Sequence, residues 1–155
     1  MFLGLAGPRA LETPGGASAG PCGSQVRAAG EEILRNLDLK IEQRLIPRVV
    51  SGQTITGTTG YHAQIVNRMR HGNFLDEGRT LYVLETHPAG YAVIATNEAE
   101  KAADIDVLEF RAAGAFGRVY LGGGEAEIAE AAKAAVAVLQ SIGGRENPGP
   151  EPVFY

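Results

Sequence analysis

Hydrophobic residues with helical spacing alternate along the chain with short runs rich in β-branched residues. Apolar positions three and four residues apart indicate the buried side of a helix, whereas strict alternation indicates a strand. The pattern predicts helices over residues 25–37, 61–70, 89–103 and 125–142, and strands over residues 45–57, 79–86, 104–112 and 116–123. From residue 45 onwards the order is β-α-β-α-β-β-α. This order predicts one sheet covered by helices, an α+β or α/β sandwich.

Alanine occupies many of the predicted buried positions on the last two helices. The stripe of helix 89–103 comprises Val93, Ile94, Ala95, Ala99 and Ala102. The stripe of helix 125–142 comprises Ile128, Ala132, Ala135, Leu139 and Ile142. Small side chains over a broad area allow close, flat packing of helices on a sheet. Such packing suits a thin domain that tiles with copies of itself.

The composition narrows the classes of function. The chain has 155 residues, of which 45% are apolar, so it can bury the core of one domain. Its net charge is −4 and its basic residues are mixed with acidic ones, whereas nucleic-acid binding normally shows as a clustered basic face. No apolar run approaches the roughly 20 residues of a membrane span, and the amino-terminal residues lack the basic flank of a signal peptide. We therefore expect a protein of the cytoplasm that binds neither nucleic acid nor membrane.

Cysteine and histidine chemistry has little support in the sequence. Cys22 is the one cysteine, so neither a disulfide framework nor a structural zinc site is available. His62, His71 and His87 are scattered, and no pair has the i, i+4 spacing of a helical metal site. A surface or capping role is favoured for each histidine. We expect no metal, no cofactor and no catalytic constellation.

Three glycines at positions 122–124 lie between a predicted strand and the last helix. A phosphate-binding loop here would need a lysine followed by serine or threonine, or the spaced glycines of a dinucleotide loop. The helix instead opens with Glu125 and Glu127, whose carboxylates satisfy the positive end of the helix dipole and would repel a phosphate. The favoured interpretation is a turn that starts a packing helix.

Residues 81–139 carry a longer pattern, LYVLETHPAGYAVIATNEAEKAADIDVLEFRAAGAFGRVYLGGGEAEIAEAAKAAVAVL. It contains a strand ending in Val-x-Glu-Thr, a helix rich in Glu-Ala-Glu-Lys-Ala-Ala, a Gly-Ala-Phe-Gly turn between two strands, and a final alanine-rich helix. This pattern resembles the bacterial microcompartment shell domain along its whole length. In the commonest form of that family, one more strand and a short helix follow the last helix. Here they come first, as PRVVSGQTITG and TGYHAQIVNRMRHG, so the chain resembles the circularly permuted members, and most of all the second half of the tandem permuted carboxysome shell proteins.

The resemblance implies a fold and a domain organisation. We expect an amino-terminal extension over residues 1–40, a permuted shell domain over residues 41–143, and a Pro-rich tail over residues 144–155. The domain would be an α+β fold in which helices cover a four-stranded antiparallel or mixed sheet. The first 40 residues would either echo the last strand and helix of a preceding copy or form a private extension.

The resemblance also implies site residues. In this family the turn between the two middle strands lines a pore on the symmetry axis, and by match that turn is Ala113, Gly114, Ala115 and Phe116. Phe116 would either narrow the opening or lie in the core, and the core is favoured because aromatic burial is common. The shell-edge lysine of the family matches Lys101. Asn97 and Arg68, which lie in the Asn-Glu-Ala-Glu-Lys and Ile-Val-Asn-Arg runs, are further interface candidates.

The function implied is structural rather than enzymatic. We expect a homohexamer that tiles edge to edge, with itself and with other shell proteins, into a microcompartment wall and passes small metabolites through a central pore. A trimer would instead indicate that residues 1–40 stand in for a lost domain. Two alternatives stay open: a small-molecule-binding or regulatory α+β oligomer, and an enzyme that uses Cys22 or His62.

Overall fold

The computed structural model describes residues 23–149, which fall into two units, one ending at Leu39 and one beginning at Lys40. The first unit contains helix α1, Gly23–Asn36, close to the predicted helix over residues 25–37. Its apolar residues Val26 and Ile33 are 59% and 60% exposed. The helix therefore has an amphipathic pattern whose apolar side is open within this unit.

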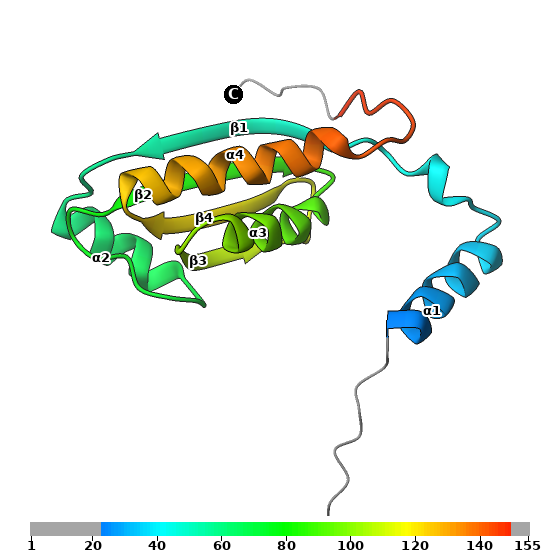
Figure 1. Ribbon diagram of the computed structural model, residues 1–155, viewed down its shortest axis with the longest axis horizontal. Helices are drawn as coiled ribbons and strands as arrows, with labels where there is room; N and C mark the ends of the chain where they lie inside the picture. The colour runs from blue at the N-terminus through cyan, green and yellow to red at the C-terminus, as the bar shows by residue number, and fades with distance from the viewer. Residues whose placement is uncertain (1–22, 150–155) are drawn as a thin grey trace, which may run out of the picture. The chain divides into compact units, whose positions relative to one another are not determined.

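The second unit contains every element predicted after residue 45, in the predicted order (Figure 1). A 3₁₀ turn, Ile41–Gln43, leads into the fold. The strands are β1 (Arg48–Ile55), β2 (Thr80–His87), β3 (Asp106–Arg111) and β4 (Gly117–Gly123), and the helices are α2 (Gly60–Met69), α3 (Tyr91–Ala102) and α4 (Glu125–Ser141). All neighbouring strands pair antiparallel, in the order β1-β2-β4-β3. The predicted α+β fold with a four-stranded sheet is confirmed.

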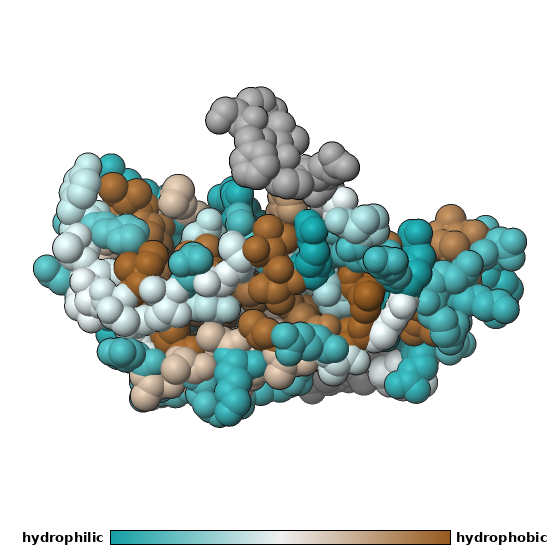
Figure 2. All heavy atoms as spheres, turned by 90° about the horizontal axis from the view of Figure 1, so that it is seen from above, coloured by the Kyte–Doolittle hydropathy of each residue, from teal (hydrophilic) through white to brown (hydrophobic). Residues whose placement is uncertain are grey.

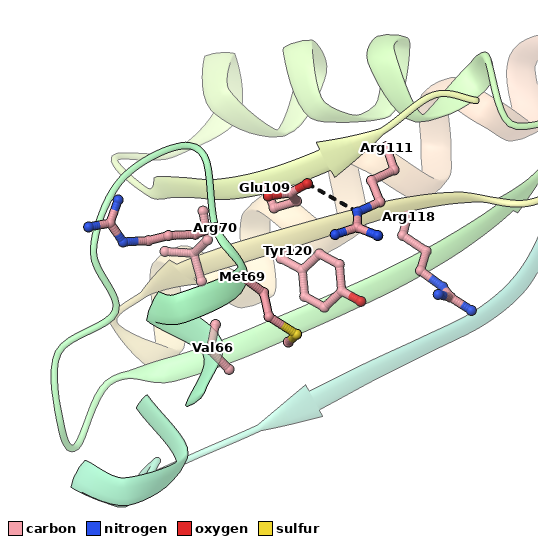
Figure 3. A pocket seen from close by; sticks show the side chains of 8 residues that line it. Val66, Met69, Arg70, Glu109, Arg111, Arg118 and Tyr120 are labelled. Atoms are coloured by element: carbon pink, nitrogen blue, oxygen red, sulfur yellow. Dashed lines mark hydrogen bonds and ion pairs between the residues drawn. The ribbon is translucent and has the colours of Figure 1, made fainter. Parts of the chain in front are cut away.

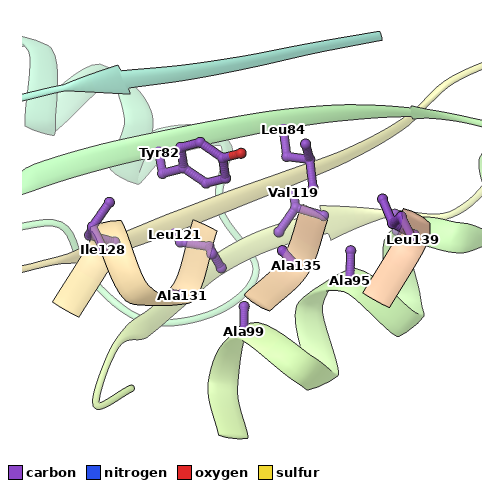
Figure 4. Packing of buried hydrophobic residues seen from close by; sticks show 11 residues of the cluster. Tyr82, Leu84, Ala95, Ala99, Val119, Leu121, Ile128, Ala131, Ala135 and Leu139 are labelled. Carbon is purple, nitrogen blue, oxygen red and sulfur yellow. The ribbon is translucent and has the colours of Figure 1, made fainter. Parts of the chain in front are cut away.

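Both faces of the sheet carry buried side chains, because successive residues of a strand point to opposite sides and helices pack on each side. Tyr82 and Leu84 of β2 join the larger core, together with α3, α4 and residues of β4 (Figure 4). Leu81 of the same strand joins a smaller core with Ala63 and Val66 of α2. Helices α3 and α4 therefore cover one face of the sheet, and α2 covers the other.

Alanines make the contact between α3 and α4. Ala95 and Ala99 of α3 and Ala131 and Ala135 of α4 are fully buried, and Figure 4 shows them between the two helices and the strands. Such small side chains let the helix backbones approach closely. Three residues that we expected on the buried side of α3 are exposed instead: the two larger ones, Val93 and Ile94, and Ala102. Val93 and Ile94 are 46% and 39% exposed, and Ala102 is exposed as well, so this part of the prediction is wrong.

The glycines at the end of β4 are packing residues. A Cβ atom on Gly122 would lie 3.1 Å from Leu75 Cδ1 and 3.2 Å from Leu108 Cδ2, closer than most real contacts of this kind. A Cβ atom on Gly123 would lie 3.3 Å from Ile128 Cγ1 on the other face. The strand can therefore pass tightly between the two cores before Gly124 caps α4.

Residues 144–149 lie against the beginning of β1 and the end of β2. Leu45 and Arg145 form a parallel bridge, and the Ile46 N–H donates to the Arg145 carbonyl at 3.0 Å. Asn147 Nδ2 donates to the carbonyls of Ile46 and His87, at 2.8 and 3.0 Å. This part of the segment predicted as a tail is therefore bound to the fold. Residues 150–155 lie outside the described residues.

Candidate functional site

One face of α3 gathers most of the residues predicted to make contacts between subunits. Val93, Asn97 and Lys101 are four residues apart, a spacing that places them on the same side of a helix. All three are exposed, and Ile94 lies beside them, with Glu98 between the two polar residues in the sequence. We call these five residues the α3 edge face.

Glu98 organises the polar half of the α3 edge face. Its Oε1 atom accepts hydrogen bonds from Lys101 Nζ at 2.7 Å and from Asn97 Nδ2 at 2.9 Å. The hydrogen bond from Lys101 is the main cause that lowers the pKa of Glu98, so this carboxylate is charged at neutral pH. Two of the predicted interface residues are thus held together, next to two exposed aliphatic side chains.

Arg68 lies apart from this cluster. It is an exposed residue on the last turn of α2, and α2 packs on the sheet face opposite to α3. Its exposed position allows a contact with another molecule.

The turn predicted to line a pore is the connection between β3 and β4. Ala113, Gly114 and Ala115 are exposed, and Gly114 has φ of 96°, a conformation that favours glycine. Phe116 is half-buried, with its ring 5.9 Å from the ring of His87. The turn therefore presents small side chains and backbone groups to the surface. Its aromatic residue, Phe116, instead lies next to His87 at the end of β2.

Two arginines flank this turn, and no pattern in the sequence singles them out. Arg111 at the end of β3 and Arg118 near the start of β4 are directly opposite each other in the antiparallel register. Arg118 Nε donates to Glu85 Oε1 at 2.6 Å, and Ser51 Oγ donates to the other oxygen of that carboxylate at 3.1 Å. The hydrogen bond with Arg118 lowers the pKa of Glu85 and raises the pKa of Arg118.

The histidines have separate partners. His71 Nδ1 is 2.7 Å from Glu109 Oε2, and His87 Nδ1 is 3.0 Å from Asn147 Oδ1. His62 lies in the first turn of α2, where its backbone N–H donates to Thr59 Oγ1 at 3.3 Å. Across residues 23–149 no three histidine, cysteine or acidic residues are grouped as a metal site would require. Cys22 lies outside the described residues.

Among the helices of the described part of the chain, none combines the length and apolar character needed to cross a membrane.

Known proteins similar to this chain are microcompartment shell proteins. No family model matches the chain. The carboxysome shell protein CcmP of Synechococcus elongatus is 50% identical over 125 residues, which is 81% of this chain and 59% of that protein. The solved fused permuted hexameric shell protein MSM0275 from the RMM microcompartment is 42% identical, over 77% of this chain and 61% of its own, with a TM-score of 0.73.

A second solved structure extends the comparison. The double ringed trimeric shell protein MSM0271 from the RMM microcompartment is 39% identical, over 80% of this chain and 62% of its own, with a TM-score of 0.77. This chain thus spans about three-fifths of the length of each of these three relatives. The order of elements predicted for a permuted shell domain is present in residues 40–149, and a relative described as permuted shares the fold. The chain therefore belongs to the bacterial microcompartment shell proteins, as a member with a circularly permuted shell domain.

Proposed function

We propose that this protein is a structural component of a microcompartment wall, where it forms cyclic oligomers that tile into a layer. The α3 edge face carries this proposal. A single chain completes both cores of its shell domain and still leaves Val93 and Ile94 at the surface beside Asn97 and Lys101. Aliphatic residues next to a lysine with a long apolar stem suit a contact between protein molecules.

The oligomer that we propose is a homohexamer. The two solved relatives are described as a fused permuted hexameric and a double ringed trimeric shell protein. Residues 40–149 hold one shell domain, and in a closed ring the shape of each subunit fixes the number of copies. Other shell proteins would join the layer through the same edges.

The passage for metabolites that we propose runs past the turn of residues 113–116. The turn is exposed, and Ala113, Gly114 and Ala115 carry no charge. A ring of such turns around a symmetry axis would offer backbone groups to small polar solutes without strong selection by charge. The proposed role is therefore structural, as part of a shell layer with a pore, and we assign no side chain to catalysis.

Mass photometry and negative-stain imaging of the purified chain test this function. We expect particles of six copies of the 16.3 kDa chain, together with rings or flat sheets in the images. Monomers or dimers alone at micromolar concentration would contradict the proposal. Rings of three copies would keep the structural role and replace the homohexamer.

A further inference from the structure

A pocket of about 130 Å³ lies on the sheet face that α2 covers (Figure 3). Val66 and Met69 of α2 form one wall, and Leu108 and Tyr120 add apolar surface from β3 and β4. Arg70, Arg111 and Arg118 also line it, with Glu109 as the one acidic lining residue. The pocket is smaller than the roughly 300–1,000 Å³ of sites that hold drug-sized ligands, so it suits a small molecule.

Arg111 and Arg118 place two positive charges directly across from each other at this pocket. Their backbones are register partners in the β3–β4 ladder, so their side chains leave the same face of the sheet (Figure 3). Like charges in directly opposite positions destabilise a sheet. Each of these charges is paired with one carboxylate of the chain, and an anion between the two arginines would contact the terminal nitrogens that these pairs leave open.

Each of these two guanidinium groups is held by a carboxylate through Nε. Arg111 Nε is 3.1 Å from Glu109 Oε1, and Arg118 Nε is 2.6 Å from Glu85 Oε1. Within the described residues, the hydrogen bonds of both groups use Nε alone. The terminal nitrogens of both arginines remain as donors, in the planar geometry that matches the oxygens of a carboxylate or phosphate.

A β-bulge in β3 shapes this wall of the pocket. The register with β4 shifts between Val107 and Glu109, so that Leu108 and Glu109 both line the pocket although they are consecutive. The N–H groups of Gly72 and Asn73 donate to the carbonyls of Leu108 and Val107, at 2.8 and 2.9 Å. A bulge fixed in this way can aim a side chain at a site.

Arg70 contacts the loop after α2 rather than a carboxylate. Its guanidinium carbon lies 3.8 Å from the centre of the Phe74 ring, and one terminal nitrogen donates to the Gly72 carbonyl. Figure 3 shows its guanidinium directed away from Arg111, towards the loop after α2. Arg70 therefore lines the rim and adds positive charge there, while Arg111 and Arg118 are the residues placed to contact a ligand.

We propose that this pocket binds the carboxylate or phosphate group of a small organic anion, with its carbon chain against Met69 and Tyr120. The site lies within one chain and needs no ring or sheet to be complete. It would let a shell protein retain a metabolite at the face of the layer, a role separate from forming the wall. The negative group would lie between Arg111 and Arg118.

Calorimetric titration of the full chain with propyl phosphate, inorganic phosphate and 1-propanol tests the site. We expect propyl phosphate to bind at low ionic strength, inorganic phosphate to bind more weakly for want of the carbon chain, and 1-propanol not to bind. Arg111→Gln should weaken the binding of propyl phosphate at least about tenfold, since it removes a charged hydrogen-bond donor. Arg111→Lys should also weaken binding, because lysine keeps the charge but loses the planar donor pair.

Arg79→Gln is the matched control. Arg79 is also an arginine beside a carboxylate, 3.8 Å from Asp106, and it is not among the residues that line the pocket. This variant should bind propyl phosphate like the parent chain. Equal binding by the parent and Arg111→Gln, or an equal loss in Arg79→Gln, would overturn the proposal. So would a change in oligomer size in Arg111→Gln without any change in binding, because the arginine would then contact a neighbouring copy. None of these results depends on whether sheets form.

Discussion

Lys101 Nζ lies 2.7 Å from Glu98 Oε1, one turn earlier on α3, so the ammonium group of a single chain already has a partner. The lysine side chain is 62% exposed, and an exposed pair of this kind exchanges partners at little cost. Lys101→Ala should therefore leave rings intact and raise the concentration needed for sheets at least about fivefold, the equivalent of about 1 kcal/mol. Negative-stain imaging over a dilution series measures this change.

Glu98→Gln tests whether Lys101 or Glu98 makes the contact with a neighbouring molecule. If Lys101 contacts a neighbouring molecule, removing the charge of its partner within the chain should leave sheet formation unchanged or increase it. Loss of sheets in Glu98→Gln, with normal sheets in Lys101→Ala, would assign the edge contact to the glutamate instead.

Val93 should contribute to assembly rather than to folding. It is 46% exposed, so Val93→Asp should change the stability of the folded domain by no more than about 0.5 kcal/mol. A charge in a contact that buries an aliphatic side chain should instead reduce the assembled fraction markedly. Circular dichroism and mass photometry measure the two effects. Ala137→Asp, at an exposed alanine of α4, is the control. Equal assembly by both variants would remove Val93 from the contact.

Ala115 is the position at which to test the proposed passage. Gly114 has φ of 96°, so a larger residue there would strain the backbone, whereas the neighbouring Ala115 is exposed without that constraint. Ala115→Arg should narrow the opening of the ring and line it with positive charge, because one substitution is repeated in every subunit. Electron cryomicroscopy of the parent and variant rings measures the opening. Density for the introduced arginine side chain between subunits, away from the symmetry axis, would contradict the assignment of this turn to the pore.

Glu85 should stabilise the fold at neutral pH and lose this effect in acid. Its pKa is lowered from 4.5, mainly by the hydrogen bond from Arg118, so its contribution is present above about pH 4.5 and disappears as the pH falls through the lower folded-state value. Glu85→Gln should cost about 1 kcal/mol at pH 7, and this cost should become smaller as the pH falls below 4.5. Urea unfolding at one protomer concentration measures this difference, with the exposed Glu130→Gln as the control. A difference that does not change with pH would contradict this prediction.

The order of elements was predictable because each helix and strand has its own hydrophobic period. The residues that α3 buries were not predictable in the same way. Val93 and Ile94 are the larger apolar residues of that helix, and the pattern alone assigns such residues to the core. In the structure, Ala95 and Ala99 take the buried positions because α3 packs closely on α4, which leaves room only for small side chains. The four-residue spacing of Val93, Asn97 and Lys101 was visible in the sequence, but it does not distinguish a contact surface from a solvated one.

The pair formed by Arg111 and Arg118 depends on register, which hydrophobic alternation specifies only within one strand. The bulge at Leu108 changes which residues of β3 share a face, and an apolar residue followed by a glutamate does not reveal it. The hydrogen bonds that hold the bulge come from Gly72 and Asn73, more than 30 positions earlier in the chain. The candidate ligand pocket could therefore be found only from the structure.

The bridge between Leu45 and Arg145 brings the entrance of the polypeptide into the shell domain next to its exit. A domain with adjoining entrance and exit can be duplicated head to tail, or opened at another exposed turn such as that of Gly78, without moving a strand. The order in which a gene encodes these elements can then change while the surface presented to neighbouring subunits stays the same.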